Sequence, residues 1–232
     1  MDNFLIDGKS VRDELLSRVD LTYRKFSEGL NPSVENILGV RIPDLRWLAR
    51  RIAKGEWTTY LDTANNYYME ERLLQGLVLG YVKPGDKVEA YLERVSAFVH
   101  IINSWSVCDS FSFAGGKIFV KANEAIIWPF LKKCMNSKEE YEVRFGVVMS
   151  MKYFIDKAHI EELFGCLDSI HHDGYYAKMA VAWALSDCFV WYPQPTLDFL
   201  QKNSLDDLTY KYTLRKIRES DRVSDEMKHL LV

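Results

Sequence analysis

The chain has 232 residues, of which 48% are hydrophobic and 27% are charged, and its net charge is −3 at pH 7. This composition excludes a disordered chain and is typical of a globular protein with a large apolar core. No stretch approaches the roughly 18 apolar residues of a membrane span, and residues 1–12 lack the apolar core of a signal peptide. We therefore expect one domain over residues 1–232, located in the cytoplasm.

Apolar residues recur at helical spacing through most of the chain, and Pro or Gly ends several of the runs. The predicted helices cover residues 7–28 (one or two helices), 41–54, 56–64, 69–82, 87–100, 123–134, 139–154, 160–167, 175–192, 196–201, 207–220 and 224–231. A loop is expected at Gly115-Gly116. No segment shows convincing strand alternation, so the sequence predicts an all-α fold.

The predicted helices come in pairs with a loose internal period. The polar residues inside successive second helices are spaced by 33–37 residues; they are Arg72, Asp109, Arg144, Lys178 and Lys211. Helix pairs that repeat every 35–45 residues or so are typical of α-solenoids, in which neighbouring pairs bury each other's apolar faces. We therefore predict an α-α superhelix whose concave face carries these polar residues.

Trp105 and Asp109 are the leading candidates for a functional site. Residues four apart lie on one face of a helix, so if residues 103–113 are helical, an indole and a carboxylate point into the same space. The alternative is that Trp105 is a core residue and Asp109 caps a helix. Taken by themselves, these two residues favour that alternative.

Two other helices carry weaker candidates. Arg144 emerges from an otherwise apolar face, either as an arginine extending from the edge of the core or as a phosphate clamp. Trp183 forms a stripe with Tyr176 and Ala180, and such a stripe is usually core. The small alanines around this indole would, however, also let another body approach closely.

Basic residues gather in two patches although the net charge is acidic. Residues 41–54 hold five bases, Arg46 among them, against one acid, and residues 210–218 hold four bases, including Lys211 and Arg215, against none. Such patches are suited to phosphates. A metal site is not expected, because His159, Cys166, His171 and His172 are irregularly spaced. The four cysteines lack paired spacing, and we expect them to be reduced and mostly buried.

Five pieces of the sequence, in order and spacing, resemble the AlkD-like DNA alkylation repair glycosylases, a family built from HEAT-like helical repeats. They extend over about residues 5–215 and are Gly39 to Arg46, Glu70 to Leu74, Trp105 with Asp109, Glu142 to Arg144, and Lys178 to Leu185 with Trp183. The segment 113–122 departs from the family's pattern.

The resemblance implies a monofunctional glycosylase that excises positively charged N3- or N7-alkylated purines from duplex DNA by hydrolysis, without base flipping. It assigns the catalytic aspartate to Asp109, the two cleft indoles to Trp105 and Trp183, and a contact with the DNA backbone to Arg144. It also places Tyr175 and Tyr176 beside the DNA. With the basic patches, the expected DNA contacts further include Lys178, Arg46, Lys211 and Arg215. We expect a monomer that needs no cofactor or metal.

Two other functions are open at this point. A HEAT-like module could bind nucleic acid without turnover, keeping the concave face but not the chemistry. An α-solenoid could also serve as a protein-interaction scaffold, since such folds hold peptides along the same surface.

Overall fold

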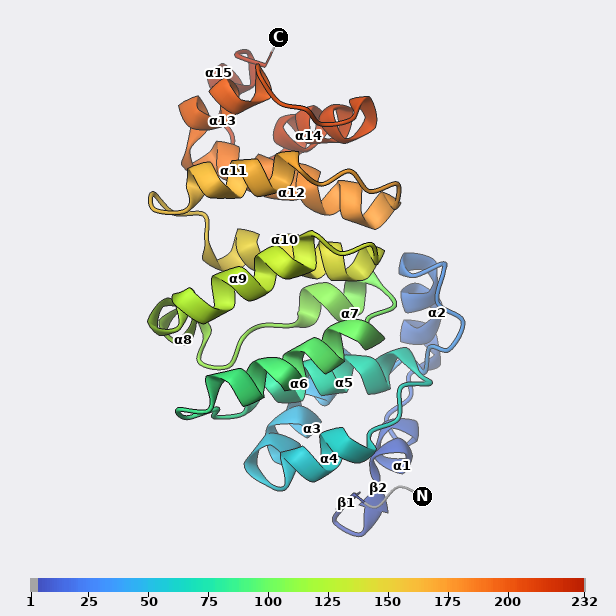
Figure 1. The fold of residues 1–232 in the computed structure, drawn as a ribbon. Helices are drawn as coiled ribbons and strands as arrows, with labels where there is room; N and C mark the ends of the chain where they lie inside the picture. The colour runs from blue at the N-terminus through green and yellow to red at the C-terminus, as the bar shows by residue number, and fades with distance from the viewer. Residues whose placement is uncertain (1–3, 232) are drawn as a thin grey trace. The chain divides into compact units, whose positions relative to one another are not determined.

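The computed structural model of the protein describes residues 4–231. Within that range it contains fifteen helices and one two-stranded hairpin, so the all-α prediction is confirmed. The chain divides into two compact units, Met1–Glu124 and Ala125–Val232 (Figure 1). The expected single domain over residues 1–232, and the continuous superhelix, stay predictions.

In the first unit the helices gather around α5, most of whose residues are buried. The helices α3, α6 and α7 all pack against it. The elements of this unit are β1 (Leu5–Ile6), β2 (Lys9–Ser10), α1 (Val11–Leu16), α2 (Leu21–Leu30), α3 (Ile42–Lys54), α4 (Trp57–Thr63), α5 (Met69–Tyr81), α6 (Val88–Ile101), α7 (Trp105–Ser110) and α8 (Gly116–Ala122).

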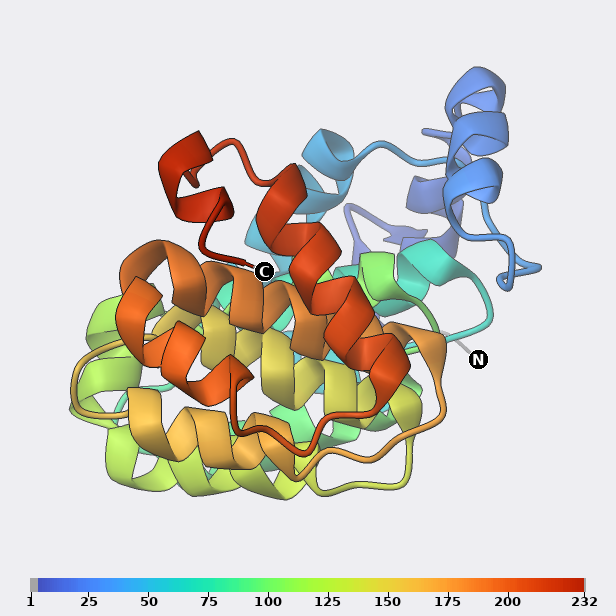
Figure 2. The same ribbon diagram turned by 90° about the horizontal axis from the view of Figure 1, so that it is seen from above.

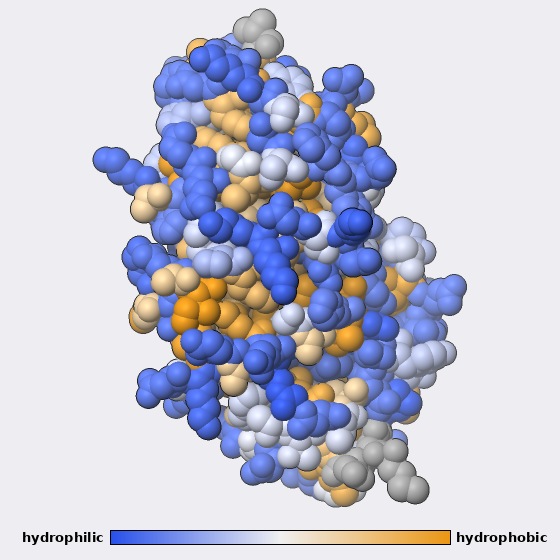
Figure 3. Space-filling view, viewed as in Figure 1, coloured by the Kyte–Doolittle hydropathy of each residue, from blue (hydrophilic) through white to orange (hydrophobic). Residues whose placement is uncertain are grey.

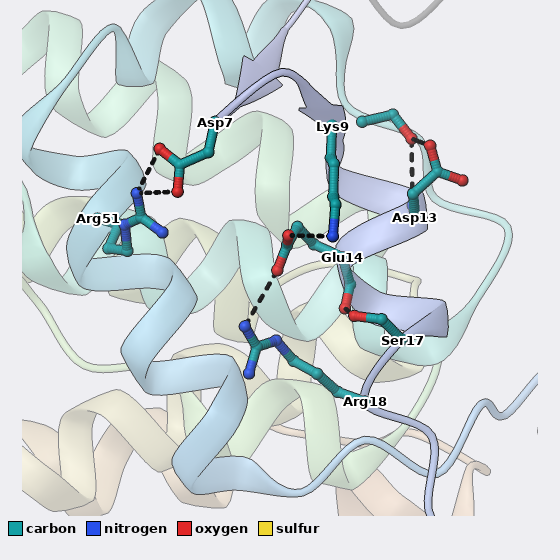
Figure 4. A network of polar contacts seen from close by, with 8 residues as sticks. Asp7, Lys9, Asp13, Glu14, Ser17, Arg18 and Arg51 are labelled. Carbon is teal, nitrogen blue, oxygen red and sulfur yellow. Dashed lines mark hydrogen bonds and ion pairs between the residues drawn. The ribbon is translucent and has the colours of Figure 1, made fainter.

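The N-terminal hairpin corrects the prediction of a helix from residue 7. Asp7 and Gly8 both have positive φ, 51° and 80°, which is the backbone that a two-residue hairpin turn requires. The first helix therefore begins at Val11, where Ser10 accepts a hydrogen bond from the backbone N–H of Asp13. Figure 4 shows how ion pairs hold this region: Asp7 binds Arg51 of α3, and Glu14 lies between Lys9 and Arg18.

A buried carboxylate joins α5 to the loop before α3. Glu70 is 1% exposed, and its oxygens accept hydrogen bonds from the backbone N–H groups of Leu38 and Gly39 at 3.0 and 2.7 Å. Three or more such bonds compensate for burying a charge, and the N–H of Val40 supplies the third at 3.3 Å. Two of the five sequence pieces, Gly39 to Arg46 and Glu70 to Leu74, are therefore joined in the structure by this buried carboxylate.

The second unit is organised around α12, which packs against α10, α13 and α14; in Figure 2, α14 (red) passes obliquely over α12 (orange). Its remaining core, near the C-terminus, centres on Phe189, Leu200 and Ile217. The helices of this unit are α9 (Glu124–Met135), α10 (Glu140–Tyr153), α11 (Ile160–Asp168), α12 (Tyr175–Trp191), α13 (Pro193–Leu200), α14 (Asp207–Glu219) and α15 (Asp225–Lys228).

Most predicted helices are present, with ends displaced by a few residues. The prediction missed α8, which begins at Gly116 directly after the expected glycine loop; Gly115 and Gly116 have φ of 68° and 61°. On the surface shown in Figure 3, hydrophilic side chains predominate, and hydrophobic ones gather over α8, where Ile118 is 85% exposed. None of the helices described in residues 4–231 is long and apolar enough to cross a membrane.

Candidate functional site

Trp105 and Asp109 lie on one face of α7, as predicted. The side chain of Ser104 caps this helix by accepting a hydrogen bond from the N–H of Val107 at 3.3 Å. Val107 and Cys108 are completely buried, so they hold the inner side of the helix in the core. Trp105 and Asp109 are both partly exposed. The geometry therefore presents an indole and a carboxylate together near the surface of the first unit.

The indole of Trp105 is oriented by a hydrogen bond from outside its own helix. Its Nε1–H donates to the carbonyl oxygen of Leu30, at the end of α2, over 3.0 Å. With the N–H engaged by protein, the part of the side chain that remains for a ligand is the ring face. An indole face attracts cations through its quadrupole and does not read the hydrogen-bonding pattern of a base.

The second indole, Trp183, lies on α12 and is 37% exposed. The alanines near it have a packing role: Ala180, Ala182 and Ala184 are at most 1% exposed, and α12 contacts α10 and α14 closely. Trp183 belongs to the second unit, and Trp105 with Asp109 to the first. The prediction that these residues act on one ligand stays a prediction.

Arg144 is an internal connector in the structure. It is 6% exposed, and its Nη1 donates to the backbone carbonyl of Tyr176, in the first turn of α12, at 3.1 Å. Glu140, one turn earlier on α10, accepts from the N–H of Tyr176 at 2.6 Å. Together these two side chains fix the start of α12, which carries Tyr175 and Tyr176.

Tyrosines from three helices of the second unit form a connected row. Tyr141 of α10 stacks on Tyr176 at 5.6 Å between ring centroids, Tyr176 contacts Tyr175 edge to face, and Tyr175 contacts Tyr212 of α14 at 6.0 Å. The guanidinium of Arg215 lies over the Tyr212 ring at 5.2 Å. The row thus joins Tyr175 and Tyr176 to the basic patch on α14. Tyr175 is 53% exposed.

Lys178 links α12 to α14. Its Nζ donates to Oδ1 of Asp206, the N-cap of α14, at 2.9 Å. Burial raises the pKa of Asp206, but hydrogen bonds from Thr209 and Lys178 outweigh it and hold the pKa at about 2. Arg72 has a similar role in the first unit, where it donates to the carbonyl of Ile101 at the end of α6. Three members of the periodic series are therefore connectors between helices.

The basic residues of α14 that we expect to contact DNA, Lys211 and Arg215, lie at the protein surface. A surface hollow of about 380 Å³ is lined by Lys211, Tyr212, Arg215, Arg218 and Glu219. Lys211 and Arg215 are exposed, as is Arg46 on α3 of the first unit. The sequence analysis counted Arg218 among the four bases of residues 210–218 but not among the expected DNA contacts, and it did not single out Tyr212.

The part of the chain that the structure describes holds no group of three or more side chains placed to bind a metal ion. Cys108, Cys134 and Cys188 are buried and Cys166 is partly exposed, which confirms the expectation of mostly buried cysteines. Their reduced state stays a prediction. Burial raises the pKa of the Cys134 thiol to about 12 and also raises that of Cys188, so neither is a reactive thiolate near neutral pH.

The fold and these residues define an all-helical protein with an indole–carboxylate face and a basic surface lined with tyrosine. A family model described as DNA alkylation repair enzyme matches residues 11–217. The chain therefore belongs to the DNA alkylation repair enzyme family. A search among curated proteins gives no match.

Proposed function

We propose that the protein is a monofunctional DNA glycosylase that removes positively charged N3- or N7-alkylated purines from duplex DNA. The observation that carries this proposal is the shared, partly exposed face of Trp105 and Asp109 on α7. Membership of the DNA alkylation repair enzyme family supports it.

The proposed chemistry needs an anion but no acid. Alkylation at N3 or N7 gives the purine a positive charge, so the base leaves without protonation when the bond between C1′ and N9 breaks and its electron pair goes to the purine. Positive charge then develops on the sugar, where the carboxylate of Asp109 stabilises it. Asp109 also orients a water molecule, whose oxygen bonds to C1′ while the carboxylate takes its proton. The products are the neutral alkylpurine and an abasic sugar.

The indoles supply selectivity for charge. Contact between a cation and an aromatic face contributes about 0.5–2 kcal/mol. The N–H of Trp105 is bonded to Leu30, which favours a role for its ring face over recognition of a base edge. We assign Trp183 as the second indole. A site that selects charge accepts different alkylpurines and needs no pocket shaped to a flipped base.

We assign the DNA backbone contacts by exposure and charge. Arg46, Lys211 and Arg215 are exposed cations and are assigned to phosphates, which makes binding dependent on salt. Tyr175 and Tyr176 are assigned to the surface beside the DNA. The family resemblance assigns Arg144 to a contact with the DNA backbone, and we keep Lys178 as a proposed DNA contact. In the structure, Arg144 also holds the first turn of α12, and Lys178 holds the N-cap of α14. We propose that one copy of the chain suffices.

The test is release of free base from methylated duplex DNA. The protein should liberate 3-methyladenine or 7-methylguanine and leave an abasic strand that stays intact until it is heated in alkali. A duplex that contains uracil, a neutral lesion, should release nothing. DNA binding that depends on salt but gives no release would contradict the proposal in favour of a non-catalytic module. Absence of DNA binding at low salt would instead indicate a protein-binding scaffold.

A further inference from the structure

The helix that carries Trp105 and Asp109 is only six residues long, α7 (Trp105–Ser110). A helix of this length is not stable alone, so its orientation depends on contacts with its surroundings. Its buried side packs against α5. Two side-chain hydrogen bonds also tie its first turn to the end of α2, 75 residues earlier in the chain.

The first of these bonds is that of the Trp105 indole to Leu30. The second lies one residue further along each segment: Oγ of Ser106 donates to Oδ1 of Asn31 at 2.8 Å. Asn31 is 2% exposed, and its Nδ2 donates to the carbonyl of Ser27 at 3.0 Å, so the amide is itself fixed against α2.

The two hydrogen bonds together fix the orientation of α7 relative to α2. The bond from Trp105 alone would let α7 rotate about that point, and rotation would carry Asp109, one turn further on, away from its position. The bond between Ser106 and Asn31 prevents this rotation. We propose that Asn31 and Ser106 are positioning residues that fix the orientation of Trp105 and Asp109. The effect on reaction rate rests on the proposed glycosylase function; the effect on Trp105 does not.

The helix offers a matched pair of variants. Ser106 and Ser110 are both partly exposed serines of α7, and each donates one short hydrogen bond. The bond of Ser106 crosses to Asn31, whereas that of Ser110 returns to the carbonyl of Ser106 in its own helix at 2.7 Å. Ser106→Ala therefore removes the attachment to α2, and Ser110→Ala removes a hydroxyl of the same kind without touching it. Ser106→Thr keeps the donor and should restore the wild-type behaviour.

Two readouts are made on the full chain. The first is the indole N–H signal of Trp105 in a ¹H–¹⁵N spectrum, assigned with Trp105→Phe; it should shift in Ser106→Ala and Asn31→Ala but stay in place in Ser110→Ala. The second is the single-turnover rate of base release at saturating protein. It should fall on the order of tenfold in Ser106→Ala, while the Kd for duplex DNA is unchanged, because small displacements of a reacting group are costly.

The inference is overturned if Ser106→Ala leaves the Trp105 signal unchanged, or if Ser110→Ala shifts that signal and lowers the rate equally. A lower thermal midpoint with an unchanged rate would show a purely structural bond and would also overturn it. If the wild-type protein releases no base, the proposed function has failed, and the Trp105 signal alone then decides whether Asn31 and Ser106 position this residue.

Discussion

At the scale of single residues, the second unit uses its buried and half-buried charges to join successive helices. Arg144 holds the first turn of α12, and Lys178 holds Asp206 at the start of α14. Such pairs connect elements that lie side by side, and their strength comes from hydrogen bonds to groups that are already ordered. The ion pair between Lys178 and Asp206 therefore makes a measurable contribution to stability at neutral pH.

Asp206→Asn should show this contribution as a dependence on pH. The folded-state pKa of Asp206 is about 2, below its ordinary value of 3.8, so the ionised group stabilises the fold above pH 4 and loses this effect as the pH falls toward 2. Because the side chain is 36% exposed, solvent screening reduces the effect to about 1 kcal/mol. Unfolding in urea at pH 7, 4 and 2.5 would measure it.

Asparagine keeps the N-cap hydrogen bonds at Oδ1. It removes the charge and the acceptor for the Thr209 hydroxyl at Oδ2, and both of these lower the pKa of Asp206. Wild type and Asp206→Asn should differ most at pH 7 and least at pH 2.5, because the folded-state pKa is about 2. Lys178→Met should remove the same contribution, and the two changes should not be additive. A difference that is constant across this pH range would contradict the assignment.

At the scale of elements, the junction of α2, α3 and α5 depends on Gly39. Its φ is +89°, and a Cβ at this position would lie 2.5 Å from Cβ of Arg24 and 2.7 Å from the carbonyl oxygen of Asp20. Its N–H is also a donor to the buried carboxylate of Glu70. The backbone conformation, the space and the hydrogen bond all require glycine here.

Gly39→Ala should therefore destabilise the protein by about 2–5 kcal/mol, from backbone strain together with overpacking. Gly29 is the matched control: it lies within α2, has open space around its Cα, and does not have positive φ. Gly29→Ala should be neutral or stabilise by roughly 0.5–1 kcal/mol. Urea denaturation of both variants measures this, and equal stabilities would contradict the role given to Gly39.

The helices were predictable because their apolar periodicity and their Pro and Gly boundaries are local signals. Pro43 and Gly55, for example, mark the first turn and the end of α3 correctly. The hairpin at Asp7-Gly8 also had a local signal, the Asp-Gly pair, but its strands are only two residues long and show no alternation. The partners of Arg144, Lys178 and Asn31 lie 28–75 residues away, and periodicity carries no information about such bonds.

For the candidate site, the i, i+4 spacing was enough to place Trp105 and Asp109 on one face of α7. It could not show that the Trp105 N–H is already bonded to Leu30, because that contact depends on how α2 ends. The exposure of Lys211, Arg215 and Tyr175 likewise follows from which sides of α12 and α14 are packed. The sequence therefore nominates candidate residues whose roles stay predictions, and the structure distinguishes the connectors among them from the exposed groups.

At the scale of the whole molecule, an acidic chain with a net charge of −3 belongs to a family of DNA alkylation repair enzymes. Local basic surfaces reconcile these facts, because phosphates respond to nearby charge over about a Debye length of 8–10 Å and not to the sum over the chain. The central claim is that the carboxylate of Asp109 stabilises the charge that develops on the sugar as a cationic purine leaves.

The measurement that tests this claim most directly is the single-turnover rate of 7-methylguanine release from duplex DNA by wild type and by Asp109→Asn. Asparagine has nearly the same shape and no charge, so binding should be retained while the rate falls by a factor on the order of 10²–10³, the cost of losing one electrostatic stabiliser. Equal rates for the two proteins, with equal affinity for the DNA, would contradict the account.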